Sequence, residues 1–446
     1  MSDLQIYVTM AVFGAVILAI AFDVIDMAVA TLLGVSVLFG FDILTEEDVL
    51  ATIRTAGGPL ALLFGGMVVA RTLSSTGIFD RVGTAYLHAT QGSGKRFLLL
   101  LVALVAPLCA FLPNATTVIL LAPIIIRVAT ALEVDFVGPM VLTAIVSNSA
   151  GLLTLVGDPA TFLVGSSIGM TFGQYLRKVS LGGLLSLLVI IPLLPLLMPD
   201  LWRARRTLPP RKSEKLIQRP RFALLAVALL IVMIGLFLFG EDLPFPIGPP
   251  AVSIIAASLA LLLIYGVKIE PVENVLRDID WKTLVFLGCI FLLVQSITKT
   301  GLVQGLSLKL YEWLGTDLML VALSLMAGIG FLSSLLANIP VVAASILMVK
   351  GYLVAVEAVP EAALGAHFTD WPATVIPLFI AMMFGATLGG NATLIGASAN
   401  IVSIGICARN GKRVTFAGWL RYGLPVTACQ LAVSALYVLA LFYFKG

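Results

Sequence analysis

Residues 154–161 read Thr154-Leu155-Val156-Gly157-Asp158-Pro159-Ala160-Thr161, and residues 393–400 read Thr393-Leu394-Ile395-Gly396-Ala397-Ser398-Ala399-Asn400. The second stretch repeats the first about half a chain later. Both are polar and glycine-rich, and both are embedded in apolar sequence. An Asn at the end of an apolar segment precedes each stretch, Asn114 in one half and Asn338 in the other. Repeated helix-breaking polar segments in a hydrophobic chain are typical of the substrate site of a secondary transporter.

The composition indicates a chain that lives in lipid. It has 446 residues, of which 60% are hydrophobic and only 11% are charged, and its mean hydropathy is +1.09. A soluble domain carries about 25% charged residues. Many apolar segments reach the roughly 20 residues that a membrane-spanning helix needs, and they are too long and too uniformly apolar for barrel strands. Because backbone groups in lipid must be bonded internally, we expect an all-α membrane protein, a polytopic helix bundle.

The basic residues are concentrated in one place. Eight lie between Arg203 and Arg221, with Glu214 as the one acid among them. A short basic loop between spans indicates the cytoplasmic side, although nucleic-acid or anionic-lipid binding is a competing interpretation of such a run. We expect a first transmembrane repeat over residues 1–199, a basic cytoplasmic linker over 200–221 and a second repeat over 222–446. We expect a multi-pass protein of the inner (cytoplasmic) membrane, with no nucleic-acid partner.

Other sequence signals argue against enzyme chemistry. The four cysteines (Cys109, Cys289, Cys407 and Cys429) are scattered singly, so they predict neither a disulfide framework nor a zinc site. The sequence contains no HExxH or P-loop motif. We therefore expect no enzyme, no metal site and no cofactor. Transport would be driven by the proton motive force, with sodium as an open alternative.

The two halves align in further places. Thr76-Gly77-Ile78 and Thr300-Gly301-Leu302 stand 224 positions apart, as do Asn114 and Asn338. After the Asn the offset grows to 239, because the second half carries about fifteen extra residues around Glu357 to Trp371. Similarity at several ordered places predicts an internal repeat.

Segments 137–165 and 373–408 are the abnormal ones among the apolar stretches. The first is interrupted at residues 147–151 and the second at residues 385–391, by Gly and polar side chains. Such interruptions leave backbone groups free to face a cavity. We expect each half to contain a re-entrant hairpin and a broken transmembrane helix. If each half crosses the membrane an odd number of times, the halves are inverted repeats about an in-plane pseudo-twofold axis.

Hydroxyl and carboxamide side chains gather at these interruptions, where they can both donate and accept hydrogen bonds. Broken helix ends add free N–H and C=O groups. Such a pocket can replace the water shell of a small, strongly hydrated solute. Taken singly, these residues could equally line ordinary helix contacts. The candidate solute ligands are Asn114, Thr116, Thr117, Ser147, Asn148, Ser149, Thr154, Asn338, Gly390, Asn391, Thr393, Ser398 and Asn400.

Asp158 is the ionisable residue in this set. An ionisable group within a span is costly and is by default functional, so we predict that Asp158 carries the coupled proton. An alternative is that Asp158 caps the helix that begins at Pro159, a role that Asp before Pro fills well. The two roles are compatible. Ala397 stands at the equivalent position of the second half, so proton chemistry would be asymmetric.

These motifs resemble those of the ion transporter superfamily. The resemblance rests on Asn114-Ala115-Thr116-Thr117 with residues 154–159, and on Ala337-Asn338-Ile339-Pro340 with residues 389–400. The superfamily includes ArsB-type arsenite efflux pumps, P-protein-like permeases, sodium/proton antiporters of the NhaD type and divalent anion/sodium symporters. The first two groups are the most similar.

The resemblance implies inverted repeats, an elevator-like motion of the site-bearing part and often a homodimer. It also leaves room for a cytosolic ATPase subunit as a partner. By the same resemblance, the residues of one half-site are Asn114, Asn148 and Asp158, and those of the other are Asn338, Asn391 and Asn400.

One departure from the superfamily pattern and one feature of the motifs themselves bear on the solute. Several cation-exchanging relatives have Asp immediately before the Asn of the first motif, where this chain has Pro113 and Ala337. The motifs also lack Arg and Lys, the usual partners of a dianion. A small inorganic solute without charge, such as arsenious acid, needs neither.

We therefore expect a secondary active transporter that couples protons to arsenite or antimonite efflux. The alternatives are a sodium-coupled dicarboxylate or sulfate importer, a sodium/proton antiporter, and a channel or structural subunit without coupled transport. Membrane lipid is an expected partner in every case.

Overall fold

The structure is a computed structural model that describes residues 2–21, 24–207, 219–336, 338–365 and 368–444. Every regular element in these residues is helical. Ten of the helices are long and apolar enough to cross a membrane. The predicted fold class, an all-α membrane protein built as a polytopic bundle, is therefore confirmed.

The first half consists of long spans followed by shorter helices. In chain order they are α1 (Asp3–Ala21), α2 (Met27–Gly40), α3 (Glu46–Ser74), α4 (Ile78–Thr90), α5 (Gly94–Cys109), α6 (Asn114–Ala131), α7 (Val137–Ala150), α8 (Pro159–Ser167), α9 (Phe172–Lys178), α10 (Ser180–Leu188), α11 (Ile190–Leu197) and α12 (Pro199–Arg203).

The second half follows the same order of elements. Its helices are α13 (Pro220–Phe239), α14 (Pro249–Val267), α15 (Val272–Arg277), α16 (Trp281–Thr298), α17 (Leu302–Leu314), α18 (Leu318–Leu335), α19 (Asn338–Ala355), α20 (Ile376–Gly389), α21 (Ser398–Arg409) and α22 (Phe416–Tyr443), with short 3-10 turns η1 (Gly240–Asp242) and η2 (Glu361–Leu364).

Equivalent turns begin α4 and α17. Gly77 (φ 72°) and Gly301 (φ 76°) precede these helices in the left-handed region, which glycine adopts without steric penalty. The preceding threonine also makes the same bond in both halves. Thr76 Oγ1 donates to the Leu73 carbonyl at 2.6 Å, and Thr300 Oγ1 donates to the Ile297 carbonyl at 2.7 Å. The internal repeat is thus visible in local geometry as well as in helix order.

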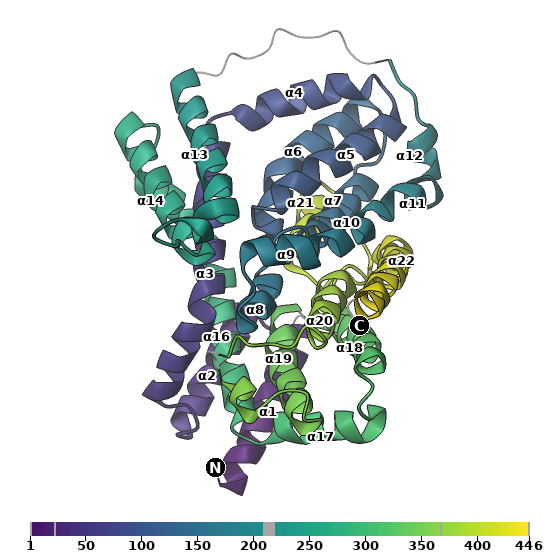
Figure 1. The fold of residues 1–446 in the computed structure, drawn as a ribbon. Coiled ribbons are helices and arrows are strands. Elements are labelled where there is room, and N and C mark those ends of the chain that lie inside the picture. The colour runs from purple at the N-terminus through teal and green to yellow at the C-terminus, as the bar shows by residue number, and fades with distance from the viewer. Residues whose placement is uncertain (1, 22–23, 208–218, 337, 366–367, 445–446) are drawn as a thin grey trace.

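The two halves pack on each other reciprocally. Helix α3 packs on α14 while α16 packs on α2, and α8 packs on α19 while α21 packs on α6. A twofold relation between the halves produces such exchanged pairs. The equivalent helices α4 and α17 lie at opposite ends of the molecule, the upper and lower edges of Figure 1. The halves therefore have opposite orientations, as inverted repeats require.

The helix breaks lie further along the chain than predicted. Residues 147–150 belong to α7, and the irregular backbone runs from Gly151 to Asp158. The Ser149 hydroxyl donates to the Ile145 carbonyl at 2.7 Å within the helix, so this polar side chain does not interrupt it.

The second break is displaced in the same way. Helix α20 continues through Gly385 to Gly389, and the irregular segment spans residues 390–397. These two glycines allow a close helix contact instead. A Cβ built on Gly385 would lie 2.5 Å from the Met326 carbonyl oxygen, and one on Gly389 would lie 2.2 Å from the Gly330 carbonyl oxygen. Small residues at such contacts let membrane helices approach closely.

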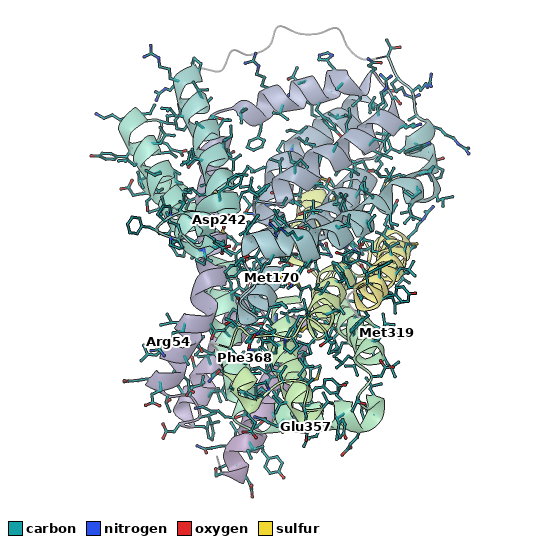
Figure 2. The ribbon with its side chains drawn as sticks, in the orientation of Figure 1. Arg54, Met170, Asp242, Met319, Glu357 and Phe368 are labelled. Atoms are coloured by element: carbon teal, nitrogen blue, oxygen red, sulfur yellow. The ribbon has the colours of Figure 1, made fainter. Side chains whose placement is uncertain are left out.

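The predicted insertion in the second half lies between α19 and α20. Its residues pass the C-terminal end of α8, where a Cβ on Gly169 would lie 2.7 Å from Thr369 Cγ2. Figure 2 shows the neighbouring Met170 and Phe368 close together in the middle of the molecule. The first half has only residues 132–136 at the equivalent place between α6 and α7.

The predicted basic linker is only partly described. All of α12 except Pro199, and the first two residues of α13, fall within residues 200–221, whereas residues 208–218 lie outside the described residues. The division into 1–199, 200–221 and 222–446, and the cytoplasmic side of the linker, stay predictions.

The contact between α18 and α20 provides a test of the fold. We expect Gly389→Ala to destabilise the protein by about 1–3 kcal/mol, because the added methyl group meets backbone that cannot turn away. The apparent melting temperature of the detergent-purified protein measures the effect. Gly328→Ala on α18 is the matched control, because a Cβ there meets nothing within 4 Å. Equal melting temperatures for the two variants would contradict the close contact.

Candidate functional site

Each half folds a helix pair back on itself beside the break. Helices α5 and α6 are joined by residues 110–113, and α18 and α19 are joined by residues 336–337, so Asn114 and Asn338 begin the second helix of each pair. With 16 residues, α5 is shorter than the roughly 20 that a full crossing needs. The connection in the first half is buried, with Leu112 exposing 1% of its surface. These pairs are the predicted hairpins, although α6, α18 and α19, with 18 residues each, are also long enough to count among the ten candidate spans.

A threonine side chain in each break forms a hydrogen bond with the hairpin of its own half. Thr154 Oγ1 donates to the Ala110 carbonyl, and Thr393 Oγ1 donates to the Ser334 carbonyl. The two bonds occupy equivalent positions of the repeat. They satisfy carbonyl groups that the turn between the hairpin helices leaves without a helical partner.

An aromatic side chain donates a hydrogen bond to each break. It comes from the second helix after the break, α9 in the first half and α22 in the second. Tyr175 Oη donates to the Leu152 carbonyl at 3.0 Å, and Trp419 Nε1 donates to the Asn391 carbonyl at 3.0 Å. Both aromatic residues are fully buried. Each is held at the start of a helix that a threonine caps, since Thr171 Oγ1 accepts from the Gln174 N–H and Thr415 Oγ1 accepts from the Gly418 N–H.

A carboxamide of the first half enters the second break. Asn148 Nδ2 donates to Asn400 Oδ1 at 2.8 Å and to Asn391 Oδ1 at 3.0 Å. Asn400 Nδ2 in turn donates to the carbonyls of Gly390 and Thr393, both at 2.8 Å. We call this set, with Ser149 and Gln430 described next, the carboxamide seam. It joins the end of α7 to both sides of the break between α20 and α21.

Gln430 on α22 completes the seam, and sequence analysis missed it. Its Oε1 accepts from Asn391 Nδ2 at 3.0 Å, while its Nε2 donates to Ser149 Oγ at 2.8 Å and to the Ser186 carbonyl at 3.1 Å. Ser149 Oγ also accepts from Asn391 Nδ2 at 3.0 Å. The signal that could have found Gln430 is a single glutamine within an apolar span.

Asp158 is held on the other side of the first break. It is 3% exposed. Its Oδ1 accepts from the Ala160 N–H at 3.4 Å, so the carboxyl group caps α8, as the alternative interpretation predicted. Its Oδ2 accepts from Asn338 Nδ2 at 3.1 Å and from Thr387 Oγ1 at 3.3 Å, both in the second half. Asp158 therefore connects the two halves.

Cationic side chains take no part in these bonds among the described residues. The partners of Asp158 are an amide, a hydroxyl and a backbone N–H, and those of the seam are neutral groups. Lys350 is buried on the same helix as Asn338. It lies twelve residues further on, about 18 Å along the helix. The centre thus carries one carboxylate and no basic partner for it.

Asn114 lies beside Asp158, and its side-chain oxygen accepts no hydrogen bond. A Cβ built on Gly151 would lie 2.8 Å from Asp158 Cβ and 3.5 Å from Asn114 Nδ2, which places both side chains around the same glycine. Asn114 Oδ1 is buried and has no hydrogen-bond partner. Its backbone carbonyl accepts from Ser147 Oγ at 3.2 Å. A ligand hydroxyl could supply the hydrogen bond that Asn114 Oδ1 lacks.

The surroundings of the centre are closely packed. A cavity lined by Gly66, Phe111, Pro113, Gly157 and Pro159, among others, measures about 10 Å³. This is room for one water molecule at most. A larger solute can enter only if the helices that line the cavity move apart.

Most of the predicted site residues are brought together here, and three are not. Thr116 is half-buried on α6, and Ser398 at the start of α21 is exposed. Thr117 is buried on α6, and its hydroxyl, like Asn114 Oδ1, has no hydrogen-bond partner. The residues that meet are Asn114, Ser147, Asn148, Ser149, Thr154, Asp158, Asn338, Gly390, Asn391, Thr393 and Asn400. Their roles toward a solute stay predictions.

The seam predicts a measurable coupling between the halves. We expect Gln430→Ala to destabilise the protein by about 1–3 kcal/mol, because it leaves the buried Asn391 amide and Ser149 hydroxyl short of a partner. A double-mutant cycle with Ser149→Ala, measured by thermal unfolding, should show non-additive effects. Gln304→Ala on the exposed face of α17 is the control. Additive effects of the two seam substitutions would contradict a direct bond.

Comparison with known proteins supports the interpretation of this chain as a membrane transporter. The chain is 42% identical over 438 residues to an uncharacterized transporter of Synechocystis sp., covering 98% of both chains. It is 26% identical over 517 residues to the human P protein, covering 98% of this chain and 60% of that protein. The crystal structure of the Alcanivorax borkumensis YdaH transporter, described as having an unusual topology, aligns with a TM-score of 0.57 at 14% identity, covering 89% of this chain and 88% of that one.

The family assignment follows from the sequence profile. Residues 17–367 match the CitMHS family, which is described as citrate transporter. The resemblance to the ion transporter superfamily and to P-protein-like permeases agrees with these matches, whereas an ArsB-type specificity is not part of them. With its ten candidate spans, paired hairpins and broken helices, this chain belongs to the CitMHS family of membrane transporters.

Proposed function

We propose that this chain is a proton-coupled secondary active transporter, in which Asp158 carries the proton and a small uncharged hydroxyl-rich solute, such as arsenious acid, is exported. The observation that carries the proposal is the position of Asp158. It is the carboxylate that bridges the two halves where the breaks and the hairpin ends meet, and it has no basic partner there.

Protonation of Asp158 would change the bonds between the halves. As a carboxylate, Asp158 accepts from Asn338 and Thr387 through the same oxygen. A protonated carboxyl group gains a donor and loses acceptor capacity. Taking up a proton would therefore weaken one of these two bonds or turn it around. Proton occupancy would then bias how the first half sits against the second, which is what coupling requires.

The charge balance of the centre supports an uncharged solute. A di- or trianion would lie against the Asp158 carboxylate with no Arg or Lys to compensate it, and such anions are usually held by charge-assisted bonds. A neutral trihydroxide instead offers donors to Asn114 Oδ1 and to carbonyls at the breaks, and accepts from amide groups. The same argument applies to antimonite.

A second candidate is a carboxylate solute that enters together with a cation. The description of the matching family, citrate transporter, favours it. Carboxylate, amide and backbone carbonyl oxygens are the ligands that hard cations prefer. A cation bound beside Asp158 would offset the charge of the solute. Sodium-coupled dicarboxylate or sulfate uptake belongs to this second candidate, and sodium/proton exchange would be the same site without an organic solute.

Several further expectations accompany the proposal. The carboxamide seam ties α7 to α20, α21 and α22, which favours movement of both breaks as one body in an elevator-like step. The basic linker would face the cytoplasm of a cell whose inner membrane holds the protein. A homodimer and a cytosolic ATPase subunit rest on the superfamily resemblance.

Asp158→Asn tests the proton carrier. Asn is also a good helix cap, and its NH2 group can donate to a turned Asn338 amide oxygen or to the Thr387 hydroxyl, so the fold should persist, but Asn cannot take up a proton. We expect pH-gradient-driven accumulation of the solute inside inverted vesicles, which corresponds to export from the cell, to be lost. Asp317→Asn is the matched control, because Asp317 caps α18 by accepting from Met319 N at 2.9 Å and lies exposed. Proton-driven transport that survives in Asp158→Asn would remove Asp158 from the coupling step.

A solute panel distinguishes the two candidates. Proteoliposomes holding the full chain would be given arsenite, antimonite, citrate, succinate or sulfate, each with a proton gradient, a sodium gradient or neither. We expect saturable arsenite flux that follows the proton gradient. Citrate uptake that needs sodium or a divalent cation, with no arsenite flux, would select the second candidate instead.

A further inference from the structure

A basic cleft lies beside the turn between α4 and α5. Helix α4 runs along the upper edge of the molecule in Figure 1. The cleft forms because the chain after α12 runs back along the turn between these helices. Arg206 N donates to the Gly92 carbonyl and Gly94 N donates to the Ala204 carbonyl, both at 2.9 Å. Gly92, at φ 73°, leaves room for this approach, since a Cβ there would lie 1.8 Å from the Arg206 carbonyl oxygen.

This docking gathers basic side chains around the cleft. Arg96, Arg205 and Arg206 line it, and Lys95 lies over the neighbouring Trp202 ring. Arg203 lines an adjoining hollow together with Arg205, Arg206 and the acids Glu133, Asp135 and Asp200. In the described part of the chain one of these five basic side chains forms an ion pair, Arg206 with Glu133 at 3.0 Å, and that pair is itself largely exposed. A cleft of about 410 Å³ opens among Gln91, Gly92, Ser93, Arg96, Arg205 and Arg206. Arg96 also donates to Gln91 Oε1.

The placement of two of these charges is unfavourable in the protein alone. Lys95 and Arg96 stand in the first turn of α5, whose start is capped by Ser93 Oγ. The N-terminal end of a helix carries partial positive charge and favours anions. Two cations there, with Arg205 alongside, repel both the helix end and each other. An anion in the cleft would relieve this repulsion.

An aromatic residue beside the cleft favours a position near the membrane surface. Trp202, a residue typical of the membrane–water interface, is half-buried beside the cleft, with Lys95 Nζ 5.3 Å from the ring centroid. Helix α4 runs along the same edge of the molecule, in the upper part of Figure 1. An anion held here would be within reach of the membrane surface.

We propose that this cleft binds the phosphate group of an anionic phospholipid such as phosphatidylglycerol. Guanidinium groups match phosphate oxygens in a two-bond geometry, and Arg96 of α5 and Arg205 of the segment after α12 both line the cleft. The site lies at the base of the α5–α6 hairpin, whose other end carries Asn114. A bound lipid would fix that base and the segment after α12 to each other. This binding is independent of the transport activity proposed above.

Lipid titration of the detergent-purified full chain, followed by native mass spectrometry, tests the site. We expect phosphatidylglycerol to bind more tightly than phosphatidylcholine. Arg96→Gln and Arg205→Gln should each weaken phosphatidylglycerol binding about fivefold, the effect of one basic residue near an anionic surface. The control is Arg221→Gln with Arg277→Gln, two exposed arginines outside the cleft. Circular dichroism and gel filtration check that each variant is folded.

The outcomes are distinct. Unchanged phosphatidylglycerol binding by the Arg96→Gln, Arg205→Gln double variant would overturn the proposal, as would equal binding of phosphatidylcholine. Inorganic phosphate is titrated in a separate arm. If it binds the cleft as tightly as phosphatidylglycerol and displaces it, the ligand is a soluble anion and the lipid assignment is wrong. Charge-preserving Arg96→Lys, Arg205→Lys should retain part of the binding, since it loses the paired geometry alone.

Discussion

Two helices that stop inside an apolar bundle impose the constraint on which the rest of the structure depends. Where α7 and α20 end, backbone groups lose their helical partners in surroundings that offer no water, and each must be satisfied locally. Thr154 and Tyr175 act at the first break, and Thr393 and Trp419 act in the same way at the second. A hairpin end and a capped aromatic helix must therefore accompany every break. This explains why the three elements recur together in both halves.

Because the halves are inverted, side chains of each half form hydrogen bonds at the break of the other. The two sets of hydrogen bonds differ in chemistry. In one, Asn148 enters the second break and every carboxamide of the seam finds neutral partners. In the other, a carboxylate receives Asn338 and Thr387, and the neighbouring Asn114 Oδ1 is left without a partner. A saturated network fixes an arrangement, whereas a titratable group beside an unsatisfied acceptor can respond to a proton or a solute. The carboxamide seam thus holds the two halves together on one side of the centre. The groups that can respond to a proton or a solute, Asp158 and Asn114, lie on the other side.

Features that depend on neighbouring residues could be predicted from the sequence. Gly77 and Gly301 stand at equivalent places of the repeat, and the capping role of Asp158 follows from the Asp-Pro pair. Features that depend on a distant partner could not. The breaks were placed too early because nothing in the sequence shows that Ser149 is satisfied within its helix or that Gly389 faces α18. Gln430 was missed because its partners lie 39 and 281 positions away. Ser398 is two residues from Asn400 but faces outward.

The two half-sites differ in sequence, and this difference limits the number of protons that the centre can exchange in one transport cycle. Position 158 carries Asp and its equivalent carries Ala397, which caps α21 without a side-chain bond. A symmetric pair of carboxylates would bring two like charges to one dry centre, and one of them would be driven to stay protonated. With a single carboxylate, the contact between the halves has only two protonation states, one with Asp158 ionised and one with Asp158 protonated. If Asp158 is the carrier, one proton per cycle is then the most that this centre can exchange.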